Sequence, residues 1–150
     1  MIVTSKDETS RWALYSFLRE RDVALPRSED FHAIGEVRRR DGIPTLVASV
    51  GYTHFCGRTC GMLVAGDGNW MTRELLWAAF DYPFNQCSMV QIFASVARNN
   101  QRALKLDLHL GFKLLTTVKD GKAPGVDFDV LTMRREDCRW LEIKKKRMAA

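Results

Sequence analysis

The segment that most constrains the fold of this chain spans residues 100–112 and reads NQRALKLDLHLGF. Its leucines alternate with polar residues, which taken alone favours a half-buried strand. A helix is the better prediction because the segment contains no β-branched residue, begins at an asparagine that can cap free N–H groups, and ends at Gly111. At about 100° per residue, the leucines and Ala103 cover one wide arc, and Asp107 lies near its centre.

Asp107 is therefore expected on the apolar face of a helix. Desolvation there should raise its pKa unless a cation or several N–H groups hold the carboxylate. Two interpretations remain open. Either Asp107 handles a proton or orients a group beside a ligand, or it pairs with a buried Arg, Tyr or Trp for packing alone.

The remaining segments predict an α/β or α+β domain. Asp41-Gly42 indicates a tight hairpin, and Ser5 followed by Glu8 fits a capping box at the start of a first helix, 7–21. The other expected elements are strands 31–39, 45–52, 58–65, 88–96, 112–119 and 126–134 and helices 72–80 and 100–110. The order of strands and helices predicts a mixed, mostly antiparallel sheet of about six strands flanked by helices in three layers. Helix 72–80 implies a right-handed parallel crossover.

The net charge and the composition limit the classes of protein to which the chain can belong. The chain has a net charge of +5, with basic residues concentrated at 38–40 and 144–147. Such a charge suits an acidic partner, either a phosphorylated cofactor or a nucleic acid, although a basic tail is more often a solvated extension. No run of about 18 apolar residues and no apolar signal core occurs, so we expect a cytoplasmic protein without a membrane partner.

The four cysteines suggest a metal site only superficially. His54, Cys56 and Cys60 lie close together in sequence, but no second pair of ligands follows them at zinc-site spacing. We therefore expect no metal and interpret the cysteines as buried free thiols.

The helix motif resembles one known superfamily. The spacing N-x-x-A-x-x-L-(Y)-x-x-x-G-F of the GNAT N-acetyltransferases is matched by Asn100, Ala103, Leu106, Gly111 and Phe112. The flanking segments 88–99 and 128–134 are similar to the fifth and last strands of that family. The resemblance covers 1–137 loosely, as a single GNAT-like domain followed by a basic extension, 138–150, and is nearest to small divergent members such as bacteriophages encode.

The resemblance implies acetyl-CoA as co-substrate and a set of contacts to it. In the family, the Asn lies near the pantetheine arm, and the Tyr, which Asp107 replaces here, protonates the departing thiolate. The implied cofactor-binding residues are the strand edge Leu63, Val64 and Ala65, the loop Gly68, Asn69, Trp70, Met71, Thr72 and Arg73, and Asn100 and Ala103.

One departure from the family is large. The family's pyrophosphate signature, Q/R-x-x-G-x-G/A, is absent, because Asp67, Trp70 and Thr72 replace its three defining positions. We expect Trp70 to obstruct a phosphate and Asp67 to repel it. Backbone N–H groups and the dipole of the following helix are unaffected by these side chains.

Three functions remain open. The first is an acyl-CoA-dependent N-acyltransferase acting on an amine of a protein or small molecule, with Glu36, His54 or Asp107 as candidate base and Asp107 the best placed. The second is a catalytically weak GNAT-like module that binds a partner (host) protein through Trp70, Trp77 and Tyr82. The third, less favoured, is a nucleic-acid-binding module that uses the basic tail.

Overall fold

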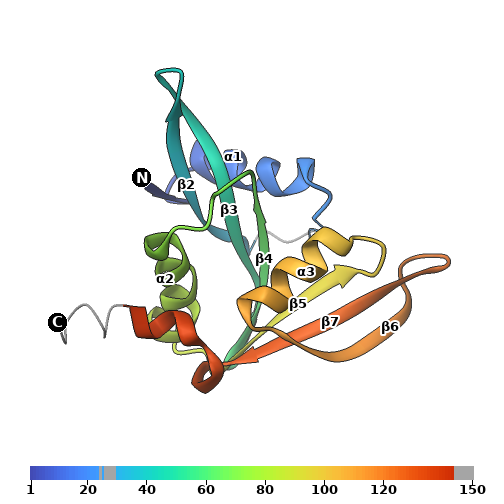
Figure 1. Cartoon of the computed structure of the whole chain (residues 1–150). Helices are drawn as coiled ribbons and strands as arrows, with labels where there is room; N and C mark the ends of the chain where they lie inside the picture. Colours follow the sequence, from blue (N-terminus) through green and yellow to red (C-terminus); the bar gives the residue numbers. More distant parts are fainter. Residues whose placement is uncertain (24, 26–29, 144–150) are drawn as a thin grey trace.

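The computed structural model describes residues 1–23, 25 and 30–143. These residues form one seven-stranded sheet and three α-helices (Figure 1). The elements are β1 (Ile2–Thr4), α1 (Glu8–Glu20), β2 (His32–Arg40), β3 (Ile43–Cys56), β4 (Thr59–Gly66), α2 (Arg73–Asp81), β5 (Gln91–Ala97), α3 (Gln101–Leu110), β6 (Lys113–Ala123) and β7 (Val126–Arg134). A π-helical turn, Tyr82–Gln86, extends α2. The predicted mixed, mostly antiparallel sheet is confirmed, with one strand, β1, that was not expected.

The sheet has the strand order β1-β2-β3-β4-β5-β7-β6. Every neighbouring pair is antiparallel except β4 and β5, which are joined through α2 and run parallel, as the predicted crossover requires. The hairpin between β2 and β3 turns at Asp41 and Gly42, with φ angles of 51° and 78°. Positive φ at both central residues is the geometry that an Asp-Gly hairpin favours, so this prediction is also confirmed.

Capping residues set the ends of the helices. Asn100 accepts a hydrogen bond from the Ala103 N–H at 3.2 Å, and Gly111 ends α3 with φ 109°. Both features of the predicted helix are confirmed. The predicted capping box at Ser5 is wrong, because Asp7 caps α1 by accepting from the Ser10 N–H at 2.8 Å. Ser5 instead accepts from the Ala33 N–H on β2.

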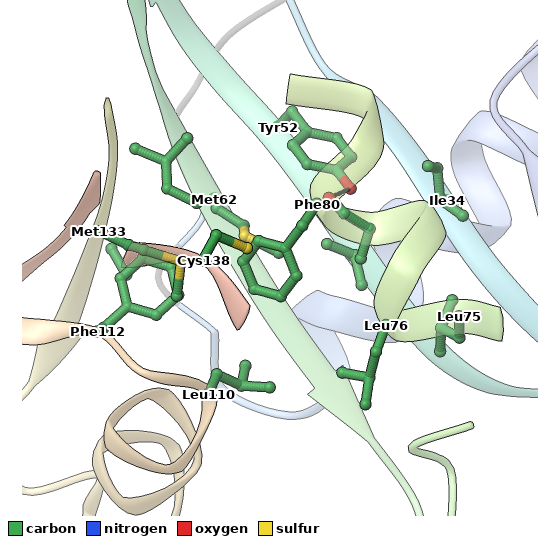
Figure 2. Close-up of a cluster of buried hydrophobic side chains, with 14 of the residues drawn as sticks. Ile34, Tyr52, Met62, Leu75, Leu76, Phe80, Leu110, Phe112, Met133 and Cys138 are labelled. Carbon is green, nitrogen blue, oxygen red and sulfur yellow. Dashed lines mark hydrogen bonds between the residues drawn. The ribbon is translucent and has the colours of Figure 1, made fainter. Parts of the chain in front are cut away.

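The core lies on both faces of the sheet. On one face, α1 packs its buried leucines and Phe17 against β2, β3 and β4. The opposite face carries α2 and α3 (Figure 1) and the larger cluster. Figure 2 labels ten of its members, Ile34, Tyr52, Met62, Leu75, Leu76, Phe80, Leu110, Phe112, Met133 and Cys138. The buried Tyr52 hydroxyl donates to the Ala79 carbonyl at 2.5 Å, which ties β3 to α2.

The last described residues pack on this core. Cys138 is buried, and the Trp140 indole N–H donates to the Leu110 carbonyl at 2.8 Å, at the C-terminal end of α3. Part of the expected extension therefore covers the core, while the basic cluster 144–147 lies outside the described residues. None of the described helices combines the length and apolar character needed to cross a membrane.

β4 and β5 are paired at only one end. The parallel ladder joins Thr59–Gly61 to Gln91–Phe93 and does not continue beyond them. Towards Gly66 and Ala97 the two strands are no longer hydrogen-bonded to each other, so the middle of the sheet is split. α3 lies across this region (Figure 1).

Candidate active site

Three neighbouring hollows follow the split between β4 and β5. The loop hollow, about 130 Å³, is lined by Arg21, Gly66, Trp70 and Arg102. The central hollow, about 30 Å³, is lined by Asp107 and by both strands. The outer hollow, about 440 Å³, opens beside β3 and β7.

The three hollows lie in a row, because neighbouring hollows share lining residues, and this row of hollows is called the groove below. Val64, Asn100 and Ala103 belong to both the loop hollow and the central hollow. Leu63 and Ser95 belong to both the central hollow and the outer hollow. The groove therefore begins at the loop before α2 and crosses the sheet to the face on which α1 packs.

Asp107 lies in the middle of this groove. Its side chain is 6% exposed, and burial raises its pKa from 3.8 to about 7. Among the described residues, no group donates a hydrogen bond to its carboxyl, so the packing interpretation, which requires an Arg, Tyr or Trp partner, has no support there. A carboxyl with this pKa exchanges its proton near neutral pH.

Ala103 lies on the same helix, one turn before Asp107, and Asn100 is the N-cap of that helix; both line the groove. The Asn100 side chain already caps α3, so its carboxamide oxygen holds the Ala103 N–H. On the opposite wall, Leu63, Val64 and Ala65 belong to the half of β4 that has no ladder to β5.

The other two candidate bases lie elsewhere. Glu36 is buried and does not point outward, but it lines none of the three hollows, and its Oε1 lies 3.1 Å from the α-amino group of Met1. His54 is exposed at the outer hollow, with its Nδ1 2.9 Å from the Thr53 hydroxyl. The structure thus brings His54 to the groove, but not Glu36.

The loop before α2 exposes backbone donors. Gly68 has φ 59°, and Arg38 donates to the Asn69 carbonyl at 2.7 Å. Thr72 caps α2 by accepting from the Leu75 N–H at 3.1 Å. The N–H groups of Gly68, Asn69 and Arg73 have no partner among the described residues. Met71, also expected at this site, is exposed.

Asp67 is not a free negative charge. Arg21 holds both of its carboxylate oxygens, at 2.8 and 2.5 Å, and this guanidinium lowers the pKa of Asp67. Arg102 and Arg40 also favour its charged form. The expected repulsion of a phosphate by Asp67 is therefore offset by cations that surround it.

Arg21 and Arg102 are the site residues that sequence reasoning missed. Arg21 is the residue after α1, and Arg102 lies in the first turn of α3, where its guanidinium donates to the Gly66 carbonyl at 3.3 Å. In the sequence they are ordinary basic residues at helix ends. Only the packing of α1 and α3 around β4 brings them together.

Trp70 is turned into the protein. It is 6% exposed, and a Cβ at Gly66 would lie 2.2 Å from its ring, so the indole packs flat on β4. The ring forms a wall of the loop hollow, while Gly68 and Asn69 remain exposed beside it. The suggestion that Trp70 is a surface anchor for a partner protein is therefore wrong.

All four cysteines are free, with Cys60 and Cys138 buried, Cys87 half-buried and Cys56 exposed. The expectation of a buried thiol therefore fails at Cys56. Within the described ranges, no three His, Cys, Asp or Glu side chains gather as metal ligands would.

Neither a protein-family model nor a curated protein sequence matches the chain. Solved structures do. A mutant of the spermidine N-acetyltransferase SpeG from Vibrio cholerae superposes with a TM-score of 0.64 and 13% identity, over 96% of this chain and 97% of that one. The ribosomal-protein-S5-alanine acetyltransferase of Vibrio fischeri gives 0.65 and 15%, over 92% and 94%. A GNAT-family acetyltransferase from Bacillus anthracis gives 0.55 and 15%, over 71% and 67%.

These likenesses identify the fold. The chain has the GNAT fold, as the helix motif indicated, and the split between its two parallel strands is where the groove lies. At such low identity the superpositions establish architecture alone, so activity has to be argued from the groove.

Proposed function

We propose that this protein is an acyl-CoA-dependent N-acyltransferase that moves an acetyl group to an amine. The observation that carries the proposal is the groove, which has the cations Arg21 and Arg102 in the lining of its loop hollow and a buried, protonatable carboxyl in its middle. Two of the solved structures with the same fold are named as a spermidine N-acetyltransferase and as a ribosomal-protein-S5-alanine acetyltransferase.

The residues of the loop hollow fit an acyl-CoA. A pyrophosphate needs donors and positive potential, which Arg21 and Arg102 would supply in the lining of the hollow. The N–H groups of Gly68, Asn69 and Arg73, which are not part of that lining, lie in the adjoining loop and at the start of α2. The amides of a pantetheine arm need backbone partners, which the unpaired half of β4 around Val64 offers, much as a strand edge accepts an added strand.

Asp107 would donate and accept a proton in this reaction. As the amine nitrogen attacks the thioester carbonyl, a C–N bond forms, the C–S bond breaks, the nitrogen loses a proton and the sulfur gains one. A carboxyl with a pKa of about 7 can give its proton to the sulfur and take one from the nitrogen at neutral pH. It would act as a shuttle, since its pKa is well below that of the tyrosine it replaces.

The alternative is a GNAT-like module that binds a partner protein without transfer. It rests on Asp67, Trp70 and Thr72, which stand where the family has its pyrophosphate signature. The two functions differ in one measurable property, the affinity for acetyl-CoA.

Thermal unfolding with acetyl-CoA tests the proposal. A ligand at about 100 times its Kd stabilises the native state by about 2.7 kcal/mol, which for a domain of this size raises Tm by roughly 5–10 °C. We expect such a rise at about 1 mM acetyl-CoA, and a smaller one for Arg102→Met. Lys105→Met, which removes an exposed charge from the same helix, is the matched control.

The outcomes are distinct. If acetyl-CoA does not raise Tm, the acyltransferase proposal fails and the partner-binding alternative is favoured. If Tm rises, release of coenzyme A in the presence of amines is measured next. Asp107→Asn should then keep the rise in Tm and lose about 100-fold in transfer rate.

A further inference from the structure

The outer hollow differs in its lining from the rest of the groove. Phe93 on β5 and Phe128 on β7 both line it, and both are half-buried. Neither ring belongs to either of the two core clusters. Along β5 the side chains of Ile92 and Ala94 enter the core while Phe93 points to the opposite face, as strand alternation requires.

This face of the sheet is only partly covered by a helix. α1 packs mainly on β2, β3 and β4, so β5 and β7 lie outside its main contacts. Two aromatic rings that line a hollow of about 440 Å³ without packing into the core offer apolar surface to a small molecule.

The described lining of the outer hollow also differs from that of the inner groove in its charge. The described residues that line it include no Asp or Glu, and its polar groups are those of Thr53, His54, Thr59 and Ser95. The acidic side chains of the groove lie one step further in, where the buried Asp107 and the exposed Asp22 line the central hollow. Among the described lining residues, the carboxylates that favour a positive charge therefore lie at the inner end.

This distribution discriminates between amines. An ammonium group taken out of water needs an opposite charge or several acceptors, or its burial is unfavourable. A polyamine carries further ammonium groups along its chain, and these would lie against Phe93 and Phe128, where the described lining offers no carboxylate. In an amine with one ammonium group and an apolar body, the ammonium group can lie near Asp107 while the body packs against Phe93 and Phe128.

We propose that the acceptor of this protein is a small monoamine with an apolar, aromatic or aliphatic body, bound with its amino group towards Asp107 and its body against Phe93 and Phe128. Its acetylation rests on the proposed function, but its binding does not. The preference is the opposite of that named for the spermidine acetyltransferases with the same fold.

Calorimetric titration of the full chain tests this preference, with 2-phenylethylamine and spermidine as the two probes, each with and without acetyl-CoA. We expect 2-phenylethylamine to bind at least about tenfold more tightly than spermidine. Phe93→Ala should weaken its binding about fivefold, as loss of an aromatic contact implies. Phe55→Ala is the matched control, because Phe55 is a half-buried ring on β3 that packs on the core and not on the hollow.

Three results would overturn the inference: spermidine binding as tightly as 2-phenylethylamine, neither amine binding, or equal effects of the two phenylalanine variants. A second variant tests the charge of the hollow without changing Phe93 or Phe128. Ser95→Asp places a carboxylate on an exposed position of the hollow and should raise the affinity for spermidine several-fold. Acetyl-CoA binding is read separately in the same titrations, so failure of the proposed function and failure of this preference are distinguishable.

Discussion

Replacing Asp107 with asparagine should change how the stability of this protein depends on pH. The substitution keeps the size of the side chain and removes its charge. Burial raises the pKa of Asp107 from 3.8 to about 7, and each unit corresponds to about 1.4 kcal/mol. The free energy of unfolding is therefore about 4 kcal/mol higher with Asp107 protonated than with Asp107 charged.

The sign follows from where the proton is held more tightly. The folded chain keeps the Asp107 proton up to a pH of about 7, whereas the unfolded chain releases it near pH 4. The contribution of Asp107 to stability is therefore most favourable below about pH 4, decreases as the pH rises to about 7, and is constant above that. Asparagine has no such dependence.

Urea unfolding at a series of pH values from about 4 to 8.5, followed by tryptophan fluorescence, measures the effect. The free energy of unfolding of Asp107→Asn, minus that of the unmodified chain, should rise by up to about 4 kcal/mol between pH 4 and pH 7 and then level off. Asp137→Asn, at an exposed position, should leave the two curves parallel. Parallel curves for Asp107→Asn as well would refute the reasoning, because the carboxyl would then not be desolvated in the fold.

Two further predictions concern packing. Gly66→Ala should destabilise the fold by about 1–3 kcal/mol, because the new Cβ would overlap the Trp70 ring, whereas Gly61→Ala on the same strand, with its nearest neighbour at 3.3 Å, should cost less; urea midpoints compare them. Trp140→Phe should cost about 1 kcal/mol through loss of the hydrogen bond to the end of α3, read as a lower Tm. Trp12→Phe, at a 62% exposed position, should leave Tm unchanged, and an equal drop would contradict the second prediction.

Local signals in the sequence were enough for most of the fold. The cap at Asn100, the stop at Gly111 and the Asp-Gly turn each act within a few residues, and each is found where it was predicted. β1 was missed because three residues are too short to display an alternation. The capping box was misassigned because Ser5 and Asp7 are both good caps, and only the contact of Ser5 with β2 decides between them.

The site was predictable only in part. The position of Asp107 in the groove follows from the apolar arc of one helix, which is a local property. The pairing of Arg21 with Asp67 joins residues 46 apart, and that of Glu36 with the chain terminus joins residues 35 apart. No periodicity records such contacts, because they depend on how strands and helices are stacked. The charge of the loop hollow therefore had to come from the structure.

The short ladder between β4 and β5 has a mechanical consequence. Among the described residues, the ladder between β4 and β5 has three residue pairs, starting at Thr59 and Gln91, and one adjacent backbone hydrogen bond from Val90 to Arg58. A ligand that contacts both Val64 and Asn100 in the loop hollow would therefore add a second link between the two halves of the sheet. Occupancy of the groove and rigidity of the whole domain are thus coupled, and amide hydrogen exchange in β5 should report on both.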